Sequence, residues 1–243
     1  MSKYILATSA GFKRTDRYGV IKPAATMLRA LELSKKERPR VLFIMTASGD
    51  NPEYLLSSYQ AMSGYSCDVE HLALAHQPTG PVEEVIGRAD VVWVGGGSVA
   101  NLLAIWKLHG VDTALTEAWH RGAVLAGVSA GSICWHVGGP TDSFGPELQV
   151  IKNGLGLIPY GNGVHYDSEE QRRPLLHKTV AAGELPLSYA TDDRIGLLYR
   201  DTEAIEVISD VDEDPATGPA AYRVENIGGK AHETRLAPGL VRE

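Results

Sequence analysis

Short apolar runs alternate with amphipathic stretches through the first half of the chain, and this alternation constrains the fold more than any other feature. Runs of strand-like length that are rich in β-branched and aliphatic residues are typical of buried strands. We expect strands at Tyr4 to Thr8, Val41 to Thr46, Val69 to Leu74, Val91 to Val94 and Val124 to Val128, and helices at Pro23 to Lys36, Pro52 to Ser63, Val82 to Arg88, Val99 to Leu108 and Val111 to His120. Strands that alternate with helices predict an α/β fold in three layers, with helices on both faces of a mostly parallel sheet.

The pattern changes after Trp135, where a Gly-Pro-Thr-Asp loop precedes a strand expected around Leu157 to Val164. A helix is expected from Ser168, as its cap, to about Ala182. From Ser188 onward the segments LSYAT, IGLLYR, EAIEVIS, AAYRVEN and HETRL predict a β-rich C-terminal part, and the acidic segment Asp210 to Pro219 predicts an exposed loop. No linker divides the chain, so we expect a single domain over residues 1–243.

Composition narrows the function classes. A net charge of −7 argues against a nucleic-acid partner, which needs a basic patch. Cys67 and Cys134 make neither a disulfide framework nor a Cys-x-x-Cys zinc motif. No apolar run approaches the ~20 residues of a membrane helix, and the first residues lack the pattern of a signal peptide. We expect a cytoplasmic protein without metal, cofactor or membrane partner; a homodimer is left open.

The segment Gly127-Val-Ser129-Ala130-Gly131 carries the strongest chemical signal. It matches Gly-x-Ser-x-Gly after a predicted buried strand and before the helix-like segment AGSICWHV, which is the context of a nucleophile elbow. Small flanking residues keep the Ser129 hydroxyl exposed, and the N–H of Ala130 is a natural oxyanion donor. The plainer alternative is a serine in an ordinary tight turn.

A second glycine-rich turn, Gly95-Gly96-Gly97-Ser98, also follows a buried strand and precedes a helix. Its spacing is not the Gly-x-Gly-x-x-Gly of dinucleotide binding. We expect the N–H of Gly97 to be a second oxyanion donor, because the carboxyl ends of neighbouring parallel strands line one crevice. Close strand–helix packing without a ligand is the alternative.

A nucleophilic serine needs a base, usually a histidine held by a carboxylate. Of eight histidines, His165 stands out, because it ends an apolar, glycine-flanked strand. His232 is a competitor, since Ser129, Asp192 and His232 would follow the α/β-hydrolase order. The turn Ala190-Thr-Asp192-Asp193-Arg194 offers the carboxylate, and chemistry alone does not choose between its two acids.

The segments VVWVGGGSVANLL, AGVSAGSICW, VHYDSEEQRR and ATDDRIGLLY resemble those of the serine peptidases that include peptidase E (aspartyl dipeptidase) and cyanophycinase. The resemblance runs from about Tyr4 to Tyr199 and implies a class I glutamine amidotransferase-like fold with serine in place of the elbow cysteine. Its order of nucleophile, histidine and acid favours His165 over His232. It further implies Asp193 as the third catalytic residue and an oxyanion hole made by Gly97 and Ala130.

The resemblance also bears on the substrate. An aspartate important in the dipeptidases would fall near Asp142, and the arginine that binds the substrate's aspartate would fall near Glu169, with Arg172 close behind. Because Glu169 is acidic, the resemblance leaves open whether this chain prefers an N-terminal aspartate. We therefore expect a serine peptidase acting on dipeptides or short peptides, with Asp142, Glu169 and Arg172 as candidate substrate-binding residues. The alternatives are another serine hydrolase such as an esterase, a non-catalytic amidotransferase-like binding module, and a nucleotide-binding protein.

Overall fold

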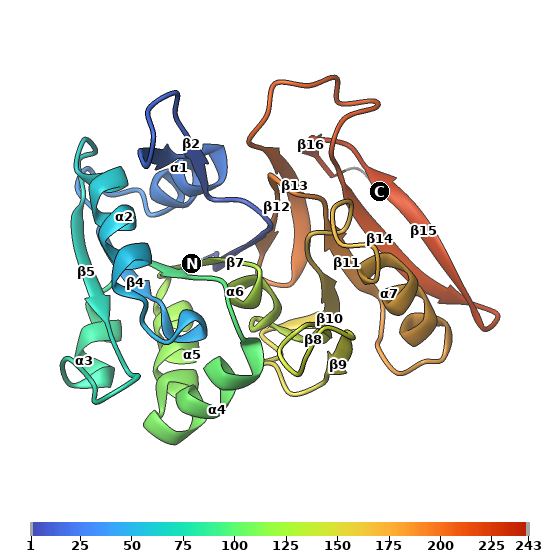
Figure 1. Cartoon of the computed structure of the whole chain (residues 1–243), viewed down its shortest axis with the longest axis horizontal. Helices are drawn as coiled ribbons and strands as arrows, with labels where there is room; N and C mark the ends of the chain where they lie inside the picture. The colour runs from blue at the N-terminus through green and yellow to red at the C-terminus, as the bar shows by residue number, and fades with distance from the viewer. Residues whose placement is uncertain (1, 242–243) are drawn as a thin grey trace.

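An eight-stranded sheet forms the centre of the computed structural model, which describes residues 2–241 (Figure 1). Its order is β16-β13-β12-β1-β7-β6-β4-β5. The strands β1, β7, β6, β4 and β5 run parallel, whereas β12, β13 and β16 add an antiparallel flank. Their bounds are β1 Tyr4–Thr8, β4 Arg40–Ile44, β5 Asp68–Leu72, β6 Val91–Val94, β7 Val124–Val128, β12 Ile195–Arg200, β13 Glu203–Ser209 and β16 Gly239–Leu240.

Helices cover both faces of this sheet because the parallel strands are apolar on both sides. Alternate residues point to opposite faces, so that Ile5 and Ala7 belong to one core cluster while Leu6 belongs to the other. The first face packs on α3 Val82–Gly87, α4 Val99–His109 and α5 Val111–Arg121, and the second on α1 Ala25–Leu33 and α2 Pro52–Met62. The expected three-layer α/β arrangement is confirmed.

A second, six-stranded sheet stands beside the first in the order β15-β14-β11-β10-β8-β9 (Figure 1). Strands β8, β10 and β11 are parallel, and β9, β14 and β15 are antiparallel additions. The bounds are β8 His136–Thr141, β9 Gln149–Ile151, β10 Ile158–Gly163, β11 Ser188–Thr191, β14 Ala221–Ile227 and β15 Lys230–Leu236, with α7 Arg172–Ala181 packed on this sheet. The sequence indicated a β-rich C-terminal part but not a separate sheet.

Three local expectations were wrong. The chain forms a hairpin of β2 Phe12–Arg14 and β3 Ile21–Pro23, so α1 begins at Ala25 rather than Pro23. The reason is tertiary: Ala24 N–H donates to Gly11 O at 2.8 Å and holds this segment in extended pairing. The short η1 Thr46–Ser48 follows β4.

The other two differences follow Ser129. The helix α6 Ala130–Ile133 is a single turn, and His136, expected in a helix, begins β8. Strand β8 also includes Gly139 to Thr141, which were expected in the Gly-Pro-Thr-Asp loop. Glycines there let β8 lie against β10, since a methyl group on Gly139 would come 3.0 Å from the Asn162 carbonyl carbon. Helix α7 begins at Arg172 rather than Ser168. The segment before it is bonded to the end of β11 instead: Tyr166 N donates to Thr191 O at 3.2 Å, and Asp167 Oδ1 accepts from Asp193 N at 2.8 Å.

Within residues 2–241, no helix combines the length and the apolar character that crossing a bilayer requires. The longest helices, such as α4 and α5, pack on the sheet through Trp106 and Trp119.

The fully buried His136 side chain links the two sheets. Its Nδ1–H donates to Ser132 O at 2.9 Å, which leaves Nε2 to accept from the Tyr199 hydroxyl of β12 at 3.2 Å. Burial lowers the pKa of His136 from 6.5 to about 4, so the folded protein holds a neutral ring where the unfolded chain takes up a proton.

Because of His136, the free energy of unfolding should fall as the pH is lowered. The stabilising contribution is complete above pH 6.5 and is lost as the pH falls toward 4. Between pH 7 and pH 5 the free energy of unfolding of the wild type should fall by about 2 kcal/mol more than that of His136→Gln. Urea titrations at both pH values measure this difference, and parallel pH dependences of the two proteins would contradict it.

Candidate functional site

Ser129 lies at a strained bend between β7 and α6. Its dihedrals are φ 57° and ψ −113°, a region that non-glycine residues rarely occupy. The Ser129 N–H donates to Thr8 O at 3.0 Å, and its carbonyl accepts from Ser132 N and Ile133 N. These bonds fix the bend against the end of β1.

Two glycines flank the bend because the backbone is crowded there. A methyl group on Gly127 would lie 2.9 Å from Val94 O, and one on Gly131 would lie 2.8 Å from the Val94 carbonyl carbon. Contacts this short essentially never occur for a real Cβ. The Gly-x-Ser-x-Gly pattern therefore has a steric cause: β7, α6 and β6 meet too closely for side chains at these positions.

The Gly95-Gly96-Gly97 turn lies directly beside Ser129. A methyl group on Gly96 would be 3.3 Å from Ser129 Cβ and 3.9 Å from its Oγ. Gly97 has φ 135° and approaches η1, where an added Cβ would lie 2.9 Å from Ser48 N. Among residues 2–241, the N–H groups of Gly97 and Ala130 donate to no protein acceptor, so both remain free for a ligand.

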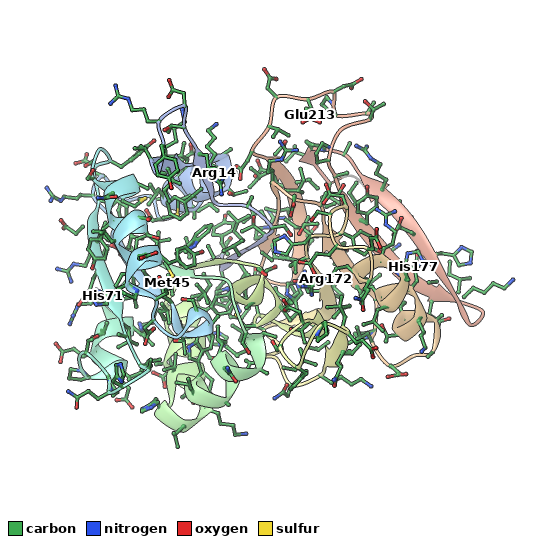
Figure 2. The ribbon with its side chains drawn as sticks, in the orientation of Figure 1. Arg14, Met45, His71, Arg172, His177 and Glu213 are labelled. Carbon is green, nitrogen blue, oxygen red and sulfur yellow. The ribbon has the colours of Figure 1, made fainter. Side chains whose placement is uncertain are left out.

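Tyr54 of α2 also reaches this turn, although nothing in the sequence pointed to it. A Cβ on Gly95 would lie 3.2 Å from the Tyr54 ring and would collide with Met45, which follows β4 and is labelled in Figure 2. Burial raises the pKa of Tyr54, and this outweighs the opposite effect of the hydrogen bond with the Gly96 backbone N–H, which lowers it. A neutral phenol therefore forms one wall beside the glycine turn.

His165 and Asp193 form a direct pair. His165 Nδ1 and Asp193 Oδ1 are 2.6 Å apart, with side-chain exposures of 23% and 38%. A carboxylate accepts, so Nδ1 carries the proton and Nε2 is left as the acceptor. Asp193 is itself held, because its N–H donates to Asp167 Oδ1 at 2.8 Å.

The alternative histidine and acid are not assembled. Asp192 is buried, and its Oδ2 accepts from Ala220 N and the Tyr222 hydroxyl, both at 3.0 Å. Burial raises the pKa of Asp192. His232 is exposed on β15, opposite Glu225. Of the two acids in the turn, the one against His165 is Asp193.

Ser129 and His165 start from adjacent anchor points. Ser129 N bonds Thr8 O, and His165 N donates to the Ser9 hydroxyl at 3.0 Å. Within residues 2–241, Ser129 Oγ makes no hydrogen bond to His165; such contacts often tighten only when substrate binds. Thr8 and Ser9 were not identified as site residues from the sequence. Their position at the carboxyl end of a predicted parallel strand, where ligand sites gather in such sheets, could have indicated them.

A buried side-chain bond also joins the two halves of the site. Ser132 Oγ of α6 donates to Asn162 Oδ1 of β10 at 2.9 Å, and β10 leads directly to His165. Asn162 Nδ2 in turn donates to Tyr189 O of β11 at 3.3 Å. The helix after Ser129 is thus tied to the strands that lead to His165 and Asp193.

The three candidate substrate-binding residues cluster beside the His165 turn. Arg172 is buried; its Nε bonds Glu169 Oε2 at 2.7 Å, a terminal nitrogen bonds Pro140 O at 2.5 Å, and another lies 3.9 Å from Asp142 Oδ1. Figure 2 labels it at the inner end of α7. With a side-chain exposure of 3%, Arg172 is engaged by the protein, whereas Asp142 and Glu169, at 63% and 39%, can meet a ligand.

Within the described part of the chain, His, Cys, Asp and Glu side chains form no group of three or more suited to a metal ion. The groups that are present are the Ser129 hydroxyl at a strained turn, the His165 imidazole oriented by a carboxylate, and two free backbone N–H donors. These are the groups that acyl transfer uses.

The chain also matches known proteins. The family model described as Peptidase family S51 matches residues 5–207. The chain is 40% identical to the uncharacterized peptidase YgaJ of Bacillus subtilis (strain 168) over 194 residues, which cover 80% of this chain and 81% of that protein. It is 27% identical to peptidase E of Streptomyces coelicolor (strain ATCC BAA-471 / A3(2) / M145) over 131 residues, 52% of this chain and 51% of that protein.

A solved structure shares the fold. The crystal structure of a peptidase from an acI-B1 Actinobacterium superposes with a TM-score of 0.71 at 15% identity, covering 100% of this chain and 98% of that one. The class I glutamine amidotransferase-like fold expected from the sequence is confirmed.

The crowding at the bend predicts that an added side chain there lowers the stability of the fold. Gly131→Ala should lower the free energy of unfolding by about 1–3 kcal/mol, because the methyl group meets the backbone of Val94, which cannot move aside. The matched control is Gly64→Ala, where a methyl group meets no atom within 4 Å; it should stay within about 1 kcal/mol of the wild type. Urea denaturation measures both, and equal stabilities would contradict the steric account.

Proposed function

The chain belongs to peptidase family S51, and on that premise we propose that it is a serine-type peptidase that cleaves dipeptides or short peptides through an acyl-enzyme. The observation that carries the proposal is the 2.6 Å bond between His165 Nδ1 and Asp193 Oδ1. This bond orients an imidazole whose anchor adjoins that of the strained Ser129. Its Nε2 is then available as the base that a serine nucleophile requires.

In the proposed mechanism, His165 takes the hydroxyl proton of Ser129 as its oxygen attacks the peptide carbonyl. The N–H groups of Gly97 and Ala130 meet the oxyanion, and one such donor contributes about 3 kcal/mol to the transition state. His165 then protonates the leaving amine. Water hydrolyses the acyl-enzyme with His165 again as base, while Asp193 holds the ring and stabilises its charged form.

Asp142 and Glu169 support a preference for peptides with a free amino end. Both carboxylates are accessible next to the His165 turn, and the buried Arg172 between them holds them in place. The Arg172 cation is already engaged, so it does not favour a substrate aspartate. We therefore propose an exopeptidase that binds the substrate's amino group rather than an acidic side chain.

The rival classes differ in measurable ways. A non-catalytic binding module predicts no reaction of Ser129 with a fluorophosphonate, and an esterase predicts turnover of short esters but not of peptides. A glutamine amidotransferase would need a cysteine nucleophile. Cys134 is fully buried in the turn after α6, and burial raises the pKa of its thiol, so it is not an activated thiolate.

Replacement of the nucleophile tests the proposal directly. Ser129→Ala should lower cleavage of a dipeptide library by about 10⁴-fold or more, because no other group can form the acyl-enzyme. Mass spectrometry of the library measures cleavage, and circular dichroism checks that the variant is folded. Wild-type protein that neither cleaves peptides nor reacts with a fluorophosphonate would overturn the proposed function.

The two neighbouring acids should behave differently. Asp193→Asn should lower kcat by about 10³- to 10⁴-fold with little change in KM, since an amide does not hold the correct imidazole tautomer. Asp192→Asn, which alters a carboxylate bonded to Ala220 and Tyr222, should change the melting temperature more than kcat. Steady-state kinetics with the best library peptide distinguishes them, and a similar kcat loss in both variants would count against Asp193.

A further inference from the structure

We propose that Ser9 is a positioning residue whose buried hydroxyl holds the base His165 and the turn bearing Asp193 in one fixed arrangement. This inference rests on the proposed function of Ser129, His165 and Asp193. Ser9 follows β1, whose last residue, Thr8, binds the nucleophile. It is 6% exposed and does not itself touch the reacting atoms.

The Ser9 hydroxyl bridges the two segments. It accepts from His165 N at 3.0 Å. On its other side it lies 3.1 Å from Thr191 O and 2.8 Å from Thr191 Oγ1, so its own hydrogen has an acceptor there. Thr191 is the last residue of β11, two positions before Asp193. A single hydroxyl therefore connects the backbone of the base to the strand that delivers the acid.

The backbone of Ser9 holds the other end of the same turn. Ser9 O accepts from Arg194 N at 3.0 Å, and Ser9 N donates to Ile195 O at 2.9 Å. Asp193 is thus enclosed between two segments that both bond Ser9, one before it and one after it. These backbone bonds survive a change of side chain, so the hydroxyl can be removed without freeing the turn from β1.

The hydrogen bond to the Ser9 hydroxyl matters because the His165 backbone is strained. His165 has φ 51°, a left-handed backbone conformation that is unfavourable for a non-glycine residue and persists only where its surroundings hold it. Its carbonyl accepts from Glu169 N at 3.1 Å, while its N–H is held by Ser9 alone among the described residues. Without the hydroxyl, the His165 backbone can relax and carry the ring away from Ser129.

The comparison of Ser9→Ala with Ser188→Ala tests this inference. Ser188 is a matched control: it is also buried, it begins β11, the strand whose last residue Ser9 contacts, and its hydroxyl likewise donates to a carbonyl, Pro186 O, at 2.9 Å. In Ser9→Ala the maximal rate of labelling by a small fluorophosphonate should fall about 10- to 100-fold. The half-saturating probe concentration should stay within about twofold, because the probe's binding surface is intact.

In Ser188→Ala the maximal labelling rate should stay within about twofold of the wild type, even where its melting temperature falls as much as that of Ser9→Ala. Ser9→Cys, whose sulfur is a weak acceptor, is a second variant for the case in which Ser9→Ala does not fold, and should show the same loss. Equal maximal rates in wild type and the folded Ser9 variant would overturn the role of Ser9. Absence of labelling in the wild type would instead overturn the proposed function.

Discussion

The bend at Ser129 is the constraint on which the rest of the site depends. An L-residue at φ 57° and ψ −113° is costly, and the surrounding structure offsets that cost with the bond from Ser129 N to Thr8 O and with two bonds to its carbonyl. The same bend brings β6, β7 and α6 so close that Gly127 and Gly131 cannot carry side chains. A hydroxyl that protrudes beside a glycine turn is the result of this crowding.

The second sheet provides the remaining groups. His165 follows β10 and Asp193 follows β11. These two strands are adjacent and parallel, so both residues lie at the carboxyl ends of the strands, on the same side of the second sheet. Two buried contacts hold this end of the second sheet against the first sheet and its helices. The His136 ring links β8 to β12, and the bond from Ser132 to Asn162 links α6 to β10. Residues outside the candidate site thereby help to fix the segments of Ser129 and His165 relative to each other.

Charge around the site is divided between buried groups that bond the protein and carboxylates that solvent can reach. Arg172 meets a carboxylate and a backbone carbonyl, which a buried guanidinium requires. Asp192 accepts from a backbone N–H and a phenol, and burial raises its pKa, so it is a less favourable place for negative charge than its neighbour. The accessible carboxylates include Asp193, which lies against His165, and the candidate substrate-binding residues Asp142 and Glu169.

The sequence by itself determined the central parallel strands, because runs such as VVWV and AVLAGV are apolar on both faces and suit only a strand covered by helices on each side. It also determined the bend, since the Gly-x-Ser-x-Gly spacing reflects a local steric requirement. Chemistry alone left Asp192 and Asp193 equivalent, and the resemblance to known peptidases favoured Asp193. Only the tertiary structure showed which acid lies against His165, that Arg172 is buried, and that Thr8 and Ser9 anchor both halves of the site. These outcomes depend on contacts between separate segments of the chain, about thirty positions apart for His165 with Asp193 and more than a hundred for Ser9 with His165. A linear pattern of hydrophobicity and glycine carries no information about which of these atoms meet.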